Sequence, residues 1–183
     1  MRILIGITGA SGSVYGIRLI EELIKNDHEV HLIISEEAKK IIRHETGYNT
    51  TCIVRKVHRS YRNNDLTSPP ASGSFMLDSM IIVPCSTRTL SSIAHGHSDT
   101  LISRAASCFL KEGRKLIIVV RETPLDLPSL RNMLTAKEAG AVILPAMPGF
   151  YHKPEKIEDL VDFIVGKILD QLQIKHDLFK RWS

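Results

Sequence analysis

The sequence predicts an α/β protein in which helices cover both faces of a parallel sheet. Short apolar runs of strand length alternate about five times with longer segments whose apolar residues recur every three to four positions, a pattern typical of strand–helix units. Polar residues follow each of these runs, and the ends of parallel strands meet at one edge of a sheet. We therefore expect a three-layer α/β/α fold with a doubly wound parallel sheet, Rossmann-like or flavodoxin-like, and a ligand at that edge.

Length and composition are those of one globular domain. The 183 residues, 43% hydrophobic and 24% charged, can bury a sizeable core, and we expect a single domain over residues 1–183. No apolar run approaches the roughly 18 residues that cross a bilayer. Three cysteines without a C-x-x-C motif predict reduced thiols in a cytoplasmic protein. A net charge of +4 favours anionic ligands but does not require nucleic acid.

The first strand, turn and helix form the stretch around which the chain is organised. An apolar strand at residues 3–7 is followed by Gly9 and Gly12, and a helical pattern runs from Val14 to Ile24. Such a turn leaves backbone N–H groups at a helix N-terminus, where a phosphate can bind. The alternative is a turn needed only for tight strand–helix packing. The glycine spacing fits neither the dinucleotide fingerprint nor the P-loop.

The second strand, residues 30–34, ends at Ser35. A dinucleotide site would place Asp or Glu there to bind the adenosine ribose, so serine favours a mononucleotide. The next helix puts Glu45 on the same face as Ala38 and Ile42. A carboxylate on that face is either solvated at the helix end or held in a site with a raised pKa.

Residues 47–74 are polar and contain proline and glycine, which predicts an irregular segment that wraps the sheet edge or the mouth of a site. The basic cluster at residues 55–59 is short and has one aromatic neighbour, so a solvated surface is favoured over a nucleic-acid patch.

Hydroxyl residues follow the third strand, residues 80–83, ahead of a helix from Leu90. Ser86, Thr87 and Thr89 lie where open parallel sheets bind ligands. Capping of the helix by Ser86 or Thr89 is the alternative.

Arg121 and Glu122 directly follow the fourth strand, residues 116–120, and arginine suits bidentate contacts with phosphate or carboxylate. The remaining predicted elements are helices at 101–110, 129–139 and 156–172 and a strand at 141–144. Lys167 lies off the apolar stripe of the last helix, a stripe that begins at Ile157. Trp182, the only tryptophan, needs a partner subunit or a site lid to pack against.

Metal and nucleophile motifs are weak. His95 and His97 are spaced i, i+2 without a carboxylate ligand pattern. Cys85 lies by the ligand edge but has no base paired with it in the sequence, which favours a packed thiol. We expect no metal.

Four motifs carry a specific resemblance. They are Gly9-Ala10-Ser11-Gly12, Pro84-Cys85-Ser86-Thr87-Arg88-Thr89-Leu90, Val120-Arg121-Glu122-Thr123-Pro124-Leu125 and Pro145-Ala146-Met147-Pro148-Gly149-Phe150-Tyr151. Together they resemble the UbiX-type flavin prenyltransferases, long labelled aromatic-acid or polyprenyl-hydroxybenzoate decarboxylases. The match covers nearly the whole chain in the right order, down to Leu178-Phe179-x-Arg181-Trp182.

The resemblance implies an enzyme that joins a dimethylallyl group from dimethylallyl phosphate to N5 and C6 of reduced FMN without a metal. The product, prenylated FMN, would serve a UbiD-type decarboxylase as its cofactor. The resemblance also implies a homo-oligomer, usually a dodecamer, with sites between subunits, no nucleic acid and no membrane. The diphosphate remains an alternative donor.

The same resemblance assigns roles to residues of this chain. FMN would contact Gly9, Ala10, Ser11, Ser35, Ser86, Thr87, Arg88, Thr89 and Arg121. The donor would contact Lys111, Arg121, Glu122, Tyr151, Lys167 and Trp182. The catalytic residues would be Ser11, Glu45, Lys111 and Glu122, with Ser11 and Glu45 handling protons near N5. Converging cations and a phenol would stabilise the leaving phosphate; position 167 is often Arg in the family, and Lys keeps the charge without the fork.

Two alternatives come from other functional classes. An FMN-dependent cysteine-type decarboxylase of the same fold would carry Ala-Asn where this chain has Thr87-Arg88. A non-catalytic FMN carrier would not need the cations of Lys111, Arg121 and Lys167. A nucleic-acid binder ranks below both, and its binding would weaken steeply with salt.

Overall fold

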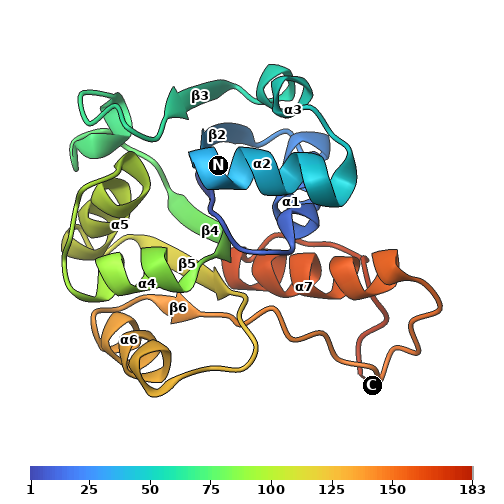
Figure 1. Ribbon diagram of the computed structural model, residues 1–183. Coiled ribbons are helices and arrows are strands. Elements are labelled where there is room, and N and C mark those ends of the chain that lie inside the picture. Colours follow the sequence, from blue (N-terminus) through green and yellow to red (C-terminus); the bar gives the residue numbers. More distant parts are fainter. Residues whose placement is uncertain (183) are drawn as a thin grey trace.

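The sheet is six-stranded and entirely parallel. The computed structural model describes residues 1–182 (Figure 1). The strands are β1 (Arg2–Ile7), β2 (Glu29–Ile34), β3 (Arg59–Arg62), β4 (Ser79–Cys85), β5 (Lys115–Val120) and β6 (Val142–Ile143). Their order is β3-β2-β1-β4-β5-β6, so the winding direction reverses between β1 and β4. In doubly wound sheets a crevice opens at this point beyond the carboxyl ends of the strands.

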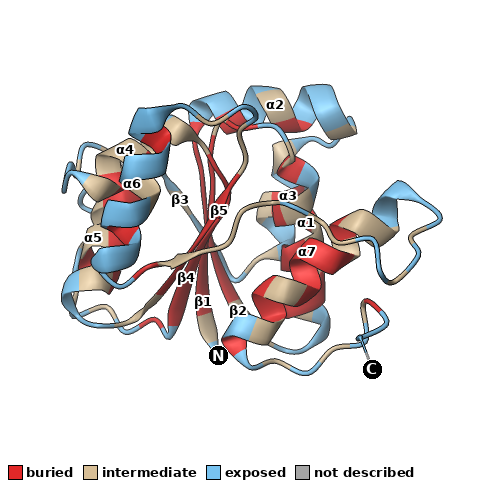
Figure 2. Cartoon of the chain, turned by 90° about the horizontal axis from the view of Figure 1, so that it is seen from below, coloured by how far each residue is buried: buried red, intermediate tan, exposed pale blue. Residues whose placement is uncertain are grey.

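Helices cover both faces of the sheet, which confirms the predicted three-layer architecture (Figure 2). One face carries α1 (Ser13–Lys25), α2 (Glu36–Thr46), α3 (Thr50–Lys56) and α7 (Ile157–Leu172). The other carries α4 (Thr87–Ala94), α5 (Leu101–Lys111) and α6 (Leu127–Glu138). No helix in the described part of the chain is long and apolar enough to cross a membrane.

Alternation along β1 shows how the two cores form. Ile3, Ile5 and Ile7 belong to the core under α1 and α7, whereas Leu4 belongs to the core under α4 and α5. Successive side chains of a strand point to opposite faces, and both faces are covered here. The strand is therefore a continuous apolar run with no polar alternation.

Residues 47–74 depart from the prediction of an irregular segment. They contain α3, the edge strand β3 and a 3-10 helix at Pro69–Ala71. Strand β3 pairs in parallel with β2, from His31↔Arg59 to Ile34↔Arg62. Its four residues are polar or aromatic and mostly exposed, so no apolar period marked it as a strand. The segment does wrap the sheet edge, as expected.

The apolar stripes of two helices begin later than predicted. Val14 is 38% exposed and Ile157 is 75% exposed, because each lies in the first turn of its helix and projects beyond the sheet. The stripes further along each helix are buried as expected.

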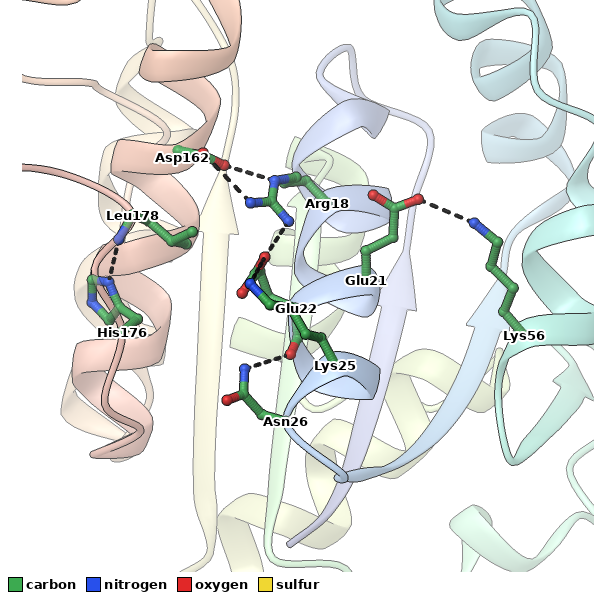
Figure 3. A network of polar contacts seen from close by, with 9 residues as sticks. All are labelled: Arg18, Glu21, Glu22, Lys25, Asn26, Lys56, Asp162, His176 and Leu178. Atoms are coloured by element: carbon green, nitrogen blue, oxygen red, sulfur yellow. Dashed lines mark hydrogen bonds and ion pairs between the residues drawn. The ribbon is translucent and has the colours of Figure 1, made fainter.

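Helices α1 and α7 are joined by a polar bridge (Figure 3). The Arg18 guanidinium of α1 donates to Asp162 of α7 at 2.7 Å and to Glu22 at 2.6 Å. Glu22 is nearly buried, and its carboxylate also has Lys25 at 3.7 Å. The bridge fixes the helix that follows the glycine turn against the helix that carries Lys167.

Candidate functional site

A cavity of about 500 Å³ opens at the carboxyl ends of the strands, within the usual size range of small-molecule sites. It is lined by the segments after β1, β2, β3, β4 and β5 and by the start of α5. All the predicted FMN residues except Ser11 line it: Gly9, Ala10, Ser35, Ser86, Thr87, Arg88, Thr89 and Arg121. Glu122 lines it as well.

The first turn of α4 faces this cavity. The Ser86 hydroxyl caps the helix by accepting from the Thr89 amide at 3.3 Å, and it donates to the Thr89 hydroxyl at 3.1 Å. The capping interpretation is therefore confirmed, and the same residues line the cavity, where ligand binding stays a prediction. The first N–H groups of a helix have no partner within the helix and carry the positive end of its dipole. This turn can hold an anionic group such as a phosphate.

Ser35 likewise caps a helix, α2, and lines the cavity. Its side chain accepts from the Ala38 amide at 3.1 Å, and the residue is only 6% exposed. It lines the cavity at the end of β2, where serine leaves room that a longer acidic side chain would fill.

The glycine turn before α1 is capped by Glu45, which corrects the predicted phosphate seat. The Glu45 carboxylate accepts from the amides of Gly12 and Ser13 at 3.0–3.1 Å and from the Ser13 hydroxyl at 2.8 Å. Gly12 has φ 95°, a left-handed conformation that glycine adopts without strain. An internal anion therefore occupies the N-terminus of α1, and the start of α4 is the better place for a ligand's phosphate.

Of the two interpretations of Glu45, the one with a raised pKa is wrong in direction. Partial burial raises the pKa of this carboxyl group, but hydrogen bonds from the side chains of Ser11 and Ser13 and from the amides of Ser13 and Gly12 outweigh burial. The pKa lies below its ordinary value. Glu45 is thus an anion at neutral pH and acts as a hydrogen-bond acceptor.

Glu45→Ala is expected to destabilise the protein by about 1–2 kcal/mol, the usual cost of losing a helix cap. Because the folded pKa is lowered, the stabilisation is fully present above the unfolded pKa and is lost as the pH falls through the folded value. Urea unfolding of the parent and the variant from pH 7 down to pH 3 measures this. The two stabilities should converge at the acid end, and a constant difference would contradict the assignment.

Arg121 connects the end of β5 with the glycine turn. Its Nε donates to the carbonyl oxygen of Ser11 at 3.1 Å, and the half-buried side chain lines the cavity. Glu122 lies beside it and accepts from the Thr123 amide at 3.2 Å. Ser11 itself is exposed, and its side chain helps to lower the pKa of Glu45.

The predicted donor residues do not converge within one chain, so the expected cluster of cations between subunits stays a prediction. Lys111 is at the far end of α5, about 15 Å along the helix from Leu101, given a rise of 1.5 Å per residue. It pairs with Glu112 at 3.3 Å. The reason is topological: α5 runs antiparallel to the strands, so only its start reaches the cavity.

Tyr151, Lys167 and Trp182 form a separate group around α7. The rings of Tyr151 and Trp182 are perpendicular with centroids 5.7 Å apart. Lys167 lines an apolar groove of about 250 Å³ between β6 and α7. Among residues 1–182, the charged residues that line the cavity are two arginines, Arg88 and Arg121, and four acidic residues: Glu36, Glu37, Asp99 and Glu122. One chain alone therefore offers no excess of positive charge there.

Several lining residues were missed by the sequence interpretation. Thr8 is 2% exposed; its hydroxyl donates to the Pro84 carbonyl at 2.9 Å and accepts from the Ser86 amide at 2.8 Å. Asn63 follows the unrecognised strand β3 and accepts from the Ile102 amide at 3.1 Å. The remaining ones are Glu36, Glu37, Asn64, Ser92, Asp99, Thr100, Ile102 and Ser103. Thr8 could have been found as the hydroxyl directly after the first strand.

The interpretation of Cys85 as a packed thiol agrees with the structure. Cys85 is fully buried, and burial raises the pKa of its thiol far above the usual range, so a packed thiol is confirmed. Within residues 1–182, Glu29, His31 and His58 are the group whose ligand atoms come close enough for a metal. Arg2 already donates to the same Glu29 oxygen at 3.1 Å, and the group lies at the start of β2, away from the cavity.

Comparisons with known proteins agree with this site. A family model described as Flavoprotein matches residues 1–169. The flavin prenyltransferase UbiX of Thermoplasma acidophilum is 49% identical over 182 residues and covers 100% of both chains.

Two solved structures superpose closely. AnUbiX (PadA1) in complex with FMN and dimethylallyl pyrophosphate has 44% identity and a TM-score of 0.98, covering 100% of this chain and 97% of the other. A dodecameric FMN-dependent UbiX-like decarboxylase from Escherichia coli O157:H7 has 40% identity and a TM-score of 0.97, covering 100% of both. Full-length identity at this level, together with the cavity at the switch point, shows that the chain belongs to the flavoprotein family and, within it, to the UbiX flavin prenyltransferases.

Proposed function

We propose that this protein transfers a dimethylallyl group from dimethylallyl phosphate or its diphosphate to N5 and C6 of reduced FMN. The observation that carries the proposal is the cavity of about 500 Å³ at the sheet's switch point, in a chain 49% identical over its full length to a flavin prenyltransferase. A structural relative binds both FMN and a dimethylallyl donor, which supports the same pair of ligands here.

The residues of the cavity fit FMN. The turn from Ser86 to Thr89 offers helix N–H groups and hydroxyls for the phosphate. Arg121 and the backbone of Gly9 and Ala10 line the adjoining wall. FMN, when bound and reduced, supplies the nucleophilic ring atoms that accept the prenyl group.

The chain's own residues would bind the donor and control protons. Arg121 offers a guanidinium at the cavity wall, and Glu122 lies next to it. The exposed Ser11 hydroxyl and the Glu45 anion, which caps the adjoining turn, are the groups proposed to hold or pass a proton. Stabilisation of the leaving phosphate by cations needs no metal ion, and Lys111 and Lys167 are the cations proposed for it.

A site shared between subunits would reconcile these roles with the separated positions of the donor residues. Lys111 and the group of Tyr151, Lys167 and Trp182 lie apart from the cavity of their own chain. A relative forms a dodecamer, and we propose the same assembly here, with cations from neighbouring copies completing each site. The product would then pass to a UbiD-type decarboxylase in the cytoplasm.

Mass spectrometry of the extracted flavin tests the proposal. The purified protein is incubated anaerobically with reduced FMN and either dimethylallyl phosphate or the diphosphate, without added metal. We expect a flavin heavier by one five-carbon unit with at least one donor. Unchanged FMN with both donors would refute the transferase and favour an FMN carrier or a thiol decarboxylase.

A further inference from the structure

The C-terminal tail, residues 173–182, folds back onto α7 (Figure 1). Phe179 is 8% exposed, and its ring centroid lies 4.9 Å from that of Phe163 on α7. Gly166 makes this approach possible, because a Cβ there would lie 2.5 Å from the Phe179 ring and 2.6 Å from the His176 ring. The tail is thus seated in a place that α7 leaves open for it.

Asp170, in the last turn of α7, is the polar anchor of the tail. Its two carboxylate oxygens accept from the Arg181 guanidinium at 2.7 and 3.2 Å, a bidentate contact. The same carboxylate faces His176 at 3.2 Å and Lys167 at 3.5 Å. Hydrogen bonds with Arg181 and His176 hold the pKa of Asp170 below its usual value despite partial burial, which alone would raise it.

The orientation of His176 is also fixed. The Leu178 amide donates to its Nδ1 at 3.3 Å (Figure 3). Nε2 of the same ring lies 3.2 Å from the Asp170 carboxylate and 3.3 Å from the Arg181 guanidinium, so His176 packs between both partners of the anchor. The side chain of His176 is 2% exposed, so this link is shielded from water, unlike the exposed side of Arg181.

The anchor determines where Trp182 lies. Trp182 directly follows Arg181 and meets Tyr151 edge to face at 5.7 Å, while remaining 80% exposed. An indole so exposed has little burial to hold it, so the Asp170–Arg181 contact next to it supplies the constraint. The Asp170 carboxylate contacts Lys167 and Arg181 directly. Through Arg181 it also holds the next residue, Trp182, which contacts Tyr151.

We propose that Asp170 is a positioning residue for the prenyl donor, docking the C-terminal tail so that Trp182 covers Tyr151 and Lys167 keeps its orientation. The inference rests on the proposed function for the role of Tyr151, Lys167 and Trp182. A residue that acts in this way affects donor binding and leaves FMN binding unchanged, since the cavity is built from other elements.

The test uses Asp170→Ala and, as a matched control, Asp162→Ala. Asp162 lies on the same helix, is equally exposed and also pairs with an arginine, Arg18, but does not contact the tail. Arg181→Ala breaks the same anchor from the tail side and serves if Asp170→Ala fails to fold. Trp182 is the only tryptophan, so the anisotropy of intrinsic fluorescence reports the tail directly.

In Asp170→Ala and Arg181→Ala, we expect lower anisotropy of Trp182 and a KM for the donor raised about tenfold, with kcat and the Kd of FMN within about twofold of the parent. Asp162→Ala should match the parent in all four. Unchanged anisotropy, or lost anisotropy with an unchanged KM in an active enzyme, would overturn the proposal. A parent that forms no prenylated flavin with either donor would instead refute the proposed function, and the two failures are thereby distinguished.

Discussion

Arg121→Ala is expected to lower kcat for prenylated FMN by about 100-fold or more, the usual cost of removing one preorganised electrostatic donor. Within residues 1–182, Arg121 is one of the two arginines that line the cavity, together with four acidic residues. It also holds the glycine turn through the Ser11 carbonyl at 3.1 Å. Its loss therefore removes charge and loosens the wall of the site at once.

A second substitution separates these two contributions. Arg121→Lys keeps the charge but loses the planar fork and its Nε–H, so we expect an intermediate loss of about tenfold. Arg131→Ala, on the exposed surface of α6, is the control and should match the parent. Single-turnover formation of prenylated FMN gives the rates, and flavin binding is measured separately by fluorescence quenching. An Arg121→Ala enzyme as fast as the Arg131→Ala control would contradict the role.

The strands could be predicted well where helices cover both faces of the sheet. The runs that became β1, β2, β4 and β5 are covered on both faces, so most of their residues are apolar. Strand β3 is an edge strand with exposed polar residues, and nothing in its composition reveals the pairing with β2. Only its pairing with β2, a tertiary contact, identifies residues 59–62 as a strand.

The site could be predicted where it follows from strand ends, but not where it follows from contacts between elements. Ser86 and Arg121 come directly after strands that the sequence identifies, so the topology places them together. The cap that Glu45 forms on α1 joins two helices far apart in the sequence. The sequence places Glu45 on the same helix face as Ala38 and Ile42; only the structure shows that the residue is exposed and that its carboxylate caps a backbone turn.

The separation of the cations leads to the other prediction with a large effect. Lys111 lies about 12 Å along α5 from Ser103, the last residue of that helix to line the cavity, whereas Arg121 lies in the cavity wall. If both act on the same donor, they must come from different copies of the chain. Lys111→Ala and Arg121→Ala should each be nearly inactive alone, by about 100-fold.

Mixed oligomers of the two variants should then recover activity. When Lys111→Ala and Arg121→Ala chains carrying different tags are coexpressed and purified through both tags, about one quarter of the shared sites receive both intact residues if the copies mix randomly around a closed ring of subunits. Arg121 and Glu122 are neighbours in one loop, so mixing Arg121→Ala with Glu122→Ala provides the matched control and should recover nothing. Recovery in the first mixture alone places Lys111 in the site of a neighbouring copy. The reason is that a site built from one chain would always lack either Lys111 or Arg121 in that mixture. Absence of recovery in both mixtures would assign Lys111 to its own chain's site or to none.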